Sequence, residues 1–184
     1  MDEAGIILKC QRGDLEKFSL LYDKYIKKIY DFIYYKTHHK ETAEDITSRV
    51  FIKAIEKISS FNIAKGTFQA WIYQVARNTV IDHYRTAKMD DNIEDVWDLS
   101  DDHDIKKDID TKEKVRELRK HLKELTPAQR EIVIMRTWQE LSYKEISEIL
   151  SKSEASCKMA YSRALKNLKD RAPLSVMVYL ACYL

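Results

Sequence analysis

Residues 142–168 read SYKEISEILSKSEASCKMAYSRALKNL, and this stretch predicts two helices joined by a short turn. Ser142 and Glu145 have the spacing of a capping box, in which each side chain accepts a hydrogen bond from the backbone N–H of the other residue at a helix start. The first helix is expected to end near Leu150, and Ser153 starts a longer one. Its inward positions recur every three or four residues, at Cys157, Tyr161, Ala164, Leu165 and Leu168. The pattern is typical of a helix-turn-helix, with Ser151 where glycine is usual.

The rest of the chain is also predicted to be helical, because its 184 residues include only 3 Gly and 2 Pro. Apolar residues recur at helical spacing over residues 18–33, 42–58 and 67–85. We expect Thr42 to cap the second of these helices, with Glu44 and Asp45 in its first turn. A second capping box, formed by Thr126 and Gln129, starts a helix that runs through Trp138. The predicted fold class is all-α.

The distribution of charge predicts two small helical domains joined by an acidic linker. Residues 1–88 carry 15 basic and 11 acidic side chains, residues 89–110 carry 2 and 10, and residues 111–184 carry 15 and 9, which gives +4, −8 and +6. We therefore expect a domain at 1–88, a linker at 89–111, a helix-turn-helix domain at 112–172 and an apolar tail at 173–184. Two basic flanks suggest a polyanionic partner.

The sequence predicts no enzymatic activity, no cofactor and no metal site. Three glycines, at positions 5, 13 and 66, cannot form the phosphate loops G-x-G-x-x-G or G-x-x-x-x-G-K. The five histidines lack metal-ligand spacing such as H-E-x-x-H, and the three cysteines lack C-x-x-C spacing. A hydrolase or metal enzyme is the disfavoured alternative.

A cytoplasmic protein is expected, because the odd, widely separated cysteines do not form a disulfide framework and the N-terminus lacks a signal-peptide pattern. The uncharged tail segment LSVMVYLACYL has eleven residues, whereas a membrane-spanning helix needs about 20. We therefore expect no membrane insertion. The tail is interpreted as an extra helix or strand packed on the preceding domain, with a docking surface for a partner as the alternative.

The outer face of the helix predicted at 67–85 carries amide, guanidinium and aromatic groups, which suit phosphates, base edges and unstacked bases. An ordinary solvated face has the same composition, so both interpretations stay open at this point. The residues concerned are Tyr73, Gln74, Arg77, Asn78, Ile81, Asp82, His83, Tyr84 and Arg85.

Three segments resemble bacterial sigma factors of the extracytoplasmic-function (ECF) group. WIYQVARNTVIDHYR at 71–85, preceded by Phe68, is similar to that family's promoter-melting helix, which reads the −10 element. TAEDITSRVFIKA at 42–54 resembles its helix that binds core RNA polymerase. LTPAQREIVIMR, LSYKEISEIL and YSRALKNLK, within 125–169, resemble its C-terminal helix-turn-helix domain. The tail after Pro173 has no counterpart in the family's shared pattern.

The resemblance implies roles for the N-terminal domain. Residues in contact with core polymerase would be Glu44, Asp45, Arg49 and Phe51, although the two acids could instead complement the helix dipole. Residues that read and open the −10 element would be Phe61, Asn62, Lys65, Trp71, Tyr73, Gln74, Arg77, Asn78, Asp82 and Arg85. The loop at 59–66 would hold a flipped base of the non-template strand. Trp71 could equally be a core residue, and Asp82 and Arg85 could simply pair.

For the C-terminal domain, the resemblance implies that the helix from Ser153 enters the major groove of the −35 element. The outward residues would be Ser153, Glu154, Ala155, Ser156, Lys158, Met159, Ser162 and Arg163. The implied partners are core RNA polymerase and promoter DNA, both as duplex and as single non-template strand, and the sequence leaves open whether an anti-sigma factor binds. The alternative function is a stand-alone helix-turn-helix repressor or activator.

Overall fold

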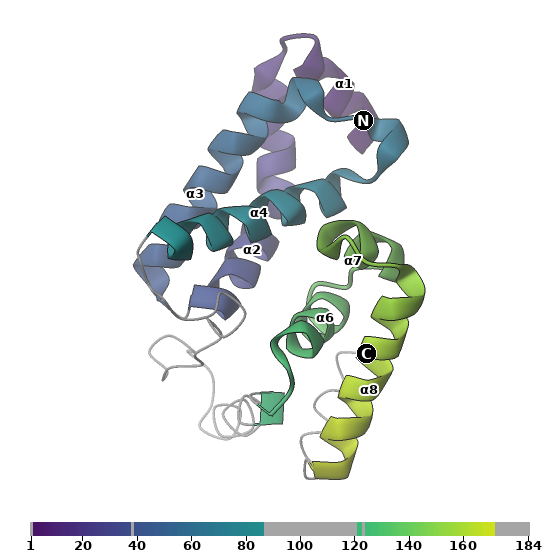
Figure 1. Ribbon diagram of the computed structural model, residues 1–184. Coiled ribbons are helices and arrows are strands. Elements are labelled where there is room, and N and C mark those ends of the chain that lie inside the picture. The colour runs from purple at the N-terminus through teal and green to yellow at the C-terminus, as the bar shows by residue number, and fades with distance from the viewer. Residues whose placement is uncertain (1, 38, 87–120, 123, 172–184) are drawn as a thin grey trace. The chain divides into compact units, whose positions relative to one another are not determined.

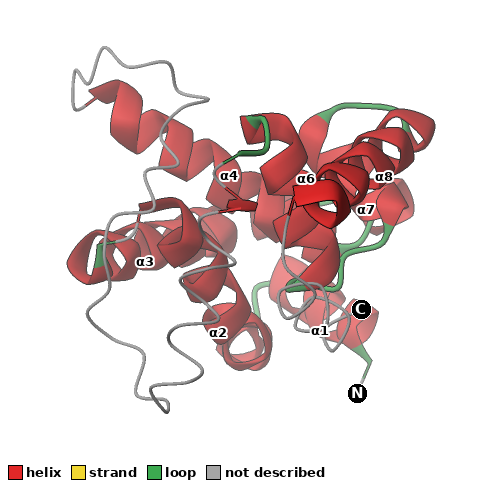
Figure 2. Ribbon diagram, turned by 90° about the horizontal axis from the view of Figure 1, so that it is seen from below, coloured by secondary structure: helices red, strands yellow, loops and turns green. Residues whose placement is uncertain are grey.

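The computed structural model describes residues 2–37, 39–86, 121–122 and 124–171, which form helices, turns and loops and no strand (Figures 1 and 2). The predicted linker at 89–111 and tail at 173–184 lie outside these ranges. The chain divides into two compact units, Met1–Val96 and Trp97–Leu184. The predicted all-α fold with two helical domains is confirmed, while the individual boundaries at 88, 111 and 172 stay predictions.

The first unit is built on three long helices, α2 (Phe18–Thr37), α3 (Lys40–Lys57) and α4 (Phe68–Thr86). Each of them packs against the other two. Their apolar stripes meet in a core in which Leu21, Ile29, Phe32, Ile46 and Ile72 are fully buried. Burial of such side chains contributes about 1.5–3 kcal/mol each. Two single-turn 3-10 helices, η2 (Ile58–Ser60) and η3 (Ile63–Lys65), lead from α3 to α4.

The structure contains a helix near the N-terminus that the sequence did not predict. Helix α1 (Glu3–Gln11) was not predicted, because its apolar residues Ile6, Ile7 and Leu8 are consecutive and lack helical spacing. Its C-cap is Arg12, and Gly13 follows with a φ of 98°, which suits glycine. The single-turn η1 (Leu15–Lys17) then leads into α2.

The N-cap predicted for α3 is wrong. His39 caps α3, since its Nδ1 accepts a hydrogen bond from the Thr42 N–H at 3.3 Å. The predicted cap, Thr42, lies inside the helix, and the first-turn acid is Glu41. Glu44 and Asp45 consequently lie beyond the first turn, where the helix dipole has little effect on them.

The second unit contains the predicted helix-turn-helix, in α6 (Pro127–Thr137), α7 (Tyr143–Leu150) and α8 (Glu154–Arg171). Both capping boxes are confirmed: the Ser142 N–H donates to Glu145 Oε2 at 2.9 Å, and the Glu145 N–H donates to Ser142 Oγ at 3.2 Å. The corresponding pair is present at Thr126 and Gln129. Helix α8 packs against α6 and α7.

The turn between α7 and α8 requires a left-handed residue, and serine provides it. Ser151 has φ 52° and ψ 44°, and the Lys152 N–H donates to the Ser147 carbonyl at 3.0 Å. This is a Schellman-type helix end, which glycine usually forms because other residues pay a steric cost in the left-handed region.

We therefore expect Ser151→Gly to stabilise the second unit by about 0.5–1 kcal/mol. The control is Ser147→Gly, which makes the same change inside α7 and should destabilise by up to about 1 kcal/mol. Native-state hydrogen exchange of α8 amides measures both effects without assuming that the two units unfold together. Destabilisation by Ser151→Gly would contradict this account of the turn.

Candidate nucleic-acid interface

An aromatic cluster supports the loop that precedes α4. The ring of Phe61 lies 5.2 Å from Trp71 and 5.8 Å from Phe68, and Phe68 lies 5.3 Å from Trp71. Phe61 and Phe68 are buried, whereas Trp71 is half-buried. Trp71 therefore serves the core and also presents part of its indole to solvent, so neither of its two proposed roles excludes the other.

The tip of this loop is exposed. Asn62 and Lys65 face solvent, and Ile63 is 37% exposed. The backbone at the tip is fixed locally, because Asn62 Oδ1 accepts from the Ala64 N–H at 2.9 Å and the Lys65 N–H donates to the Asn62 carbonyl at 3.0 Å. Of the predicted loop residues, Phe61 is buried against Phe68 and Trp71 at the base of the loop, while Asn62 and Lys65 are exposed and available to a ligand.

The outer face of α4 presents most of the side chains expected there. Exposed or half-buried positions include Gln74, Arg77, Asn78, Asp82 and Arg85. Tyr84 is half-buried, and burial raises the pKa of its hydroxyl, so this group stays a neutral donor at physiological pH.

Tyr73 does not lie on this face, and the expectation for it is corrected. Its side chain is fully buried, with its ring 5.1 Å from Phe32 of α2 in an edge-to-face arrangement. Tyrosine occurs on both solvent-exposed and buried helix faces. Its polar hydroxyl led to the expectation that Tyr73 lies on the solvent-exposed face. The position follows Ile72 on the inner side of α4, and its side chain fills the core.

Asp82 is tied to α3. Lys53 Nζ lies 3.6 Å from Asp82 Oδ2 and donates to Thr79 Oγ1 at 3.2 Å, and Thr79 lies on α4. This contact links α3 with the outer face of α4. Asp82 therefore has a partner other than Arg85, the residue with which the sequence suggested it could pair.

On α3, the polymerase-binding residues predicted from the sequence separate into two groups. Glu44, Asp45 and Arg49 are exposed, and Asp45 and Arg49 form an ion pair at 2.7 Å. Phe51 is only 5% exposed and packs against Phe18 and Tyr22, so direct contact with a partner is not available to it in this structure.

Sequence reasoning missed an apolar residue on the outer side of α3. Ile52 is 55% exposed and lies three positions after Arg49, so the two share a helix face. The sequence does contain a signal for an exposed apolar residue here, because Phe51 and Ile52 are adjacent and bulky. A single apolar stripe of a helix can bury only one of the two. Tyr22, which is 41% exposed and lies against Phe51, adds to this apolar area.

On α8, buried positions recur every three or four residues, as the helix-turn-helix pattern predicted. Cys157, Tyr161, Ala164 and Leu168 are buried, and Leu165 is half-buried. Exposed or half-buried outward positions are Ser153, Glu154, Ala155, Ser156, Lys158, Met159, Ser162 and Arg163. Ser153 caps the helix, since its Oγ accepts from the Ser156 N–H at 3.2 Å.

The ring of Tyr143, the first residue of α7, lies close to two cations. The Arg136 guanidinium lies 5.0 Å from the ring centroid and Lys158 Nζ lies 5.7 Å from it. Lys158 also lies 3.8 Å from Glu154, one helical turn earlier. Cation–π contacts of this kind contribute about 0.5–1 kcal/mol at exposed sites, so they orient these basic groups without neutralising them.

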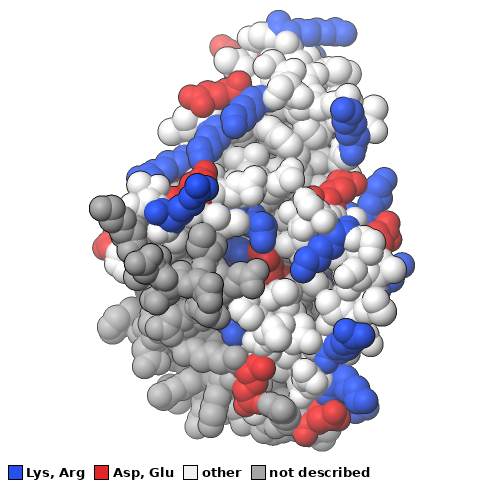
Figure 3. All heavy atoms as spheres, viewed as in Figure 1, with Lys and Arg blue, Asp and Glu red and all other residues white. Residues whose placement is uncertain are grey.

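Basic side chains gather in a diagonal row over the upper part of Figure 3, which belongs to the first unit, with acidic groups beside them.

Within the described residues, no group of three or more His, Cys, Asp or Glu side chains could hold a metal ion, and no helix has the length and apolar character needed to cross a membrane. The outer faces of α3, of α4 with the loop before it, and of α8 are the three candidate surfaces, and each combines polar or charged side chains with aromatic or apolar ones.

Comparison with known families matches both units. Sigma-70 region 2 matches residues 21–89, and sigma-70 region 4 matches residues 116–168. The ECF RNA polymerase sigma factor SigM of Bacillus subtilis (strain 168) is 32% identical over 150 residues, which cover 81% of this chain and 91% of SigM. The chain belongs to the ECF RNA polymerase sigma factors. A sigma factor directs RNA polymerase to promoters, and the stand-alone repressor or activator is not favoured.

Two further comparisons concern the sequence and the fold. The ECF RNA polymerase sigma factor BldN of Streptomyces coelicolor is 30% identical over 174 residues, which cover 91% of this chain and 65% of BldN. The fold is shared with the sigma factor RpoE of Bartonella quintana, solved in complex with the anti-sigma factor NepR. That match has a TM-score of 0.67 and 20% identity and covers 84% of this sigma factor and 96% of RpoE.

The orientation of α8 leads to a prediction about thiol chemistry. Burial raises the pKa of Cys157, so at pH 8 its thiol is protonated and inaccessible and should react with iodoacetamide only on unfolding. In a Cys10→Ala, Cys182→Ser background, Ala155→Cys places a thiol on the exposed face of the same helix as a matched control. We expect that thiol to react at least about a hundredfold faster than Cys157. Equal rates, measured by mass spectrometry, would mean that α8 is oriented differently.

Proposed function

We propose that this sigma factor binds core RNA polymerase, reads and opens the −10 element with residues 1–88 and reads the −35 element with residues 112–172. The observation that carries the proposal is the exposed loop tip beside a half-buried indole. Asn62 and Lys65 protrude next to the aromatic cluster of Phe61, Phe68 and Trp71, in the unit that matches region 2. The linker at 89–111 is acidic, so DNA repels it and would bind the basic flanks instead.

Opening a promoter without ATP is a binding problem. Unpairing costs a few kcal/mol per base, and stacking on aromatic rings with contacts to the displaced strand can offset it. The loop tip and Trp71 supply a stacking surface, and Arg77 and Asn78 supply donors for phosphates and base edges one to two turns further along α4. In this proposal the polymerase carries out the chemistry and the sigma factor selects the strand.

For polymerase binding we propose the face of α3 that presents Glu44, Asp45, Arg49 and Ile52. An exposed isoleucine beside charged groups matches the usual composition of a protein interface, with an apolar centre and a polar rim. Phe51 supports this face by packing beneath it against Tyr22.

For the −35 element we propose that α8 enters the major groove with Lys158 and Arg163 contacting phosphates or guanines. Both side chains are exposed, and Lys158 is oriented by Tyr143. Ser153, Glu154, Ala155, Ser156, Met159 and Ser162 complete the outward surface.

The proposed site of action is the cytoplasm, where a bacterial polymerase meets promoter DNA. An anti-sigma factor is a further candidate partner, because RpoE, which has the same fold, was solved in complex with the anti-sigma factor NepR.

The function is tested by transcription in vitro with purified core polymerase on fragments of the source genome. We expect specific initiation only when the protein is added, and we expect Arg77→Ala and Asn78→Ala to slow open-complex formation about tenfold or more because each removes donors to the displaced strand. Permanganate reactivity of unpaired thymines measures opening, and native gels measure binding to core polymerase.

The matched control is Arg12→Ala, which removes an exposed guanidinium outside α4 and should change neither measurement. If no fragment is transcribed while the protein alone protects duplex DNA, the repressor interpretation replaces this proposal. Equal loss of opening and polymerase binding would mean that Arg77 and Asn78 are structural.

The −35 proposal predicts that Lys158→Ala and Arg163→Ala each weaken binding of holoenzyme to promoter duplex by about tenfold and reduce its salt dependence. Lys169→Ala, an exposed lysine near the end of α8, is the control that should have little effect. Fluorescence anisotropy over a series of salt concentrations measures both quantities. A stronger effect at position 169 than at 158 would place the DNA elsewhere.

A further inference from the structure

Helix α1 is bound to the segment that joins α3 to α4, and Gln11 makes the connection. Gln11 Nε2 donates to the carbonyl of Ile58 at 3.0 Å and to the carbonyl of Phe61 at 2.6 Å. A primary amide nitrogen has two N–H groups, so a single side chain can satisfy both carbonyls. These bonds span 47 and 50 residues and lie in a half-buried environment. They fix the backbone at the first residue of η2 and at Phe61 directly after η2, immediately before the exposed loop tip.

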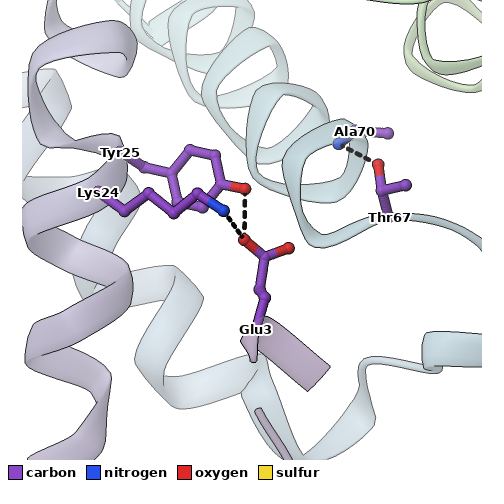
Figure 4. Close-up of polar contacts among 5 residues, drawn as sticks. All are labelled: Glu3, Lys24, Tyr25, Thr67 and Ala70. Atoms are coloured by element: carbon purple, nitrogen blue, oxygen red, sulfur yellow. Dashed lines mark hydrogen bonds and ion pairs between the residues drawn. The ribbon is translucent and has the colours of Figure 1, made fainter. Parts of the chain in front are cut away.

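The opposite end of α1 is also fixed, close to where the same segment enters α4. Glu3 Oε2 accepts a hydrogen bond from the Tyr25 hydroxyl at 2.7 Å and from Lys24 Nζ at 2.6 Å, as Figure 4 shows. The ring of Tyr25 packs 5.4 Å from Phe68, the first residue of α4. Thr67 caps α4 directly before it, accepting from the Ala70 N–H at 3.1 Å (Figure 4). Helix α1 therefore bonds directly to the segment through Gln11, and its other end is anchored to α2 through Tyr25, whose ring contacts the start of α4.

A loop that is already ordered before binding favours the capture of a single base. Ordering one residue costs about 1–2 kcal/mol of conformational free energy, and a loop that is ordered before binding does not pay this cost on binding. The Asn62 and Lys65 bonds fix the tip internally, but they do not fix it relative to Trp71. The Gln11 bonds supply that connection, because Phe61, whose carbonyl they hold, is also the residue whose ring contacts Trp71.

We propose that Gln11 is a positioning residue for capture of an unpaired promoter base, and that α1 acts as the brace that holds the 58–66 loop in its base-receptive form. Helix α1 precedes residues 21–89, the segment that matches region 2. Gln11 itself does not contact DNA in this scheme. The inference rests on the proposed function and assigns a specific residue to one step of it.

The test measures how sensitive holoenzyme is to removal of single bases. Fork-junction promoter DNA carries one abasic site at a time along the non-template strand of the −10 element, and affinity is measured by fluorescence anisotropy. For the wild type we expect binding about tenfold weaker than to intact DNA when the abasic site replaces the captured base. Gln11→Met keeps the length and bulk of the side chain but removes both N–H donors. We therefore expect this variant to bind intact DNA about fivefold more weakly than the wild type. An abasic site at the captured position should then weaken its binding little further.

The matched control is Lys9→Met, the same new side chain at an exposed position of α1, which should behave as the wild type. Gln11→Glu is a second variant: its carboxylate would face two carbonyl oxygens, and it should lose sensitivity at least as strongly as Gln11→Met. Binding to core polymerase and the far-UV circular dichroism spectrum should be unchanged in all three variants.

The outcomes separate the inference from the function on which it rests. If Gln11→Met weakens binding by the same factor at every position, or keeps the full sensitivity to the missing base, the brace has no role in capture and the inference is overturned. The same holds if the wild type initiates transcription but responds to no single abasic site. If the wild type initiates at no promoter, the proposed function itself fails.

Discussion

The packing of α4 against α2 and α3 is the constraint on which the first unit depends. Tyr73 packs against Phe32, Ile72 is fully buried, and Phe68 contacts Tyr25 at the start of the helix. An α-helix that buries one side fully must present the other side to solvent, so this core determines which α4 residues can meet DNA. The charged and amide side chains of α4 face outward because Phe68, Ile72 and Tyr73 are anchored inward.

Much of the architecture could be predicted from the sequence, because helix caps and apolar spacing are local signals. The two capping boxes and the inward face of α8 were predicted correctly from residues such as Ser142, Glu145 and Cys157. The error about Tyr73 lies where tertiary contacts decide, because an amphipathic side chain suits either face and only packing shows which side it takes. Phe51 follows the apolar spacing of residues 42–58 and is buried as that spacing predicts. Helix α1 was missed because its stability depends on distant partners, Tyr25 and the carbonyls near Phe61, which no local pattern contains.

The three surfaces differ in how their charges are used. Asp45 and Arg49 neutralise each other on α3, which leaves Ile52 as the feature that a protein partner could bury. Exposed ion pairs of this kind contribute only about 0–1 kcal/mol, so breaking or retaining the pair on binding costs little. On α8, Lys158 has a looser ion pair, with its Nζ 3.8 Å from Glu154 Oε2, and Arg163 is a second exposed cation. Such exposed cations suit a phosphate-rich ligand whose affinity depends on counterion release.

Helix α3 also connects the two proposed surfaces of the first unit mechanically. Its outer face carries Asp45, Arg49 and Ile52, while Lys53, on the next position, reaches Thr79 and Asp82 of α4. Because the two helices pack through a shared core and are joined by this side chain, a partner that docks on α3 fixes the direction of α4 at the same time. Docking on polymerase through α3 would then determine where the α4 face and the 58–66 loop meet DNA.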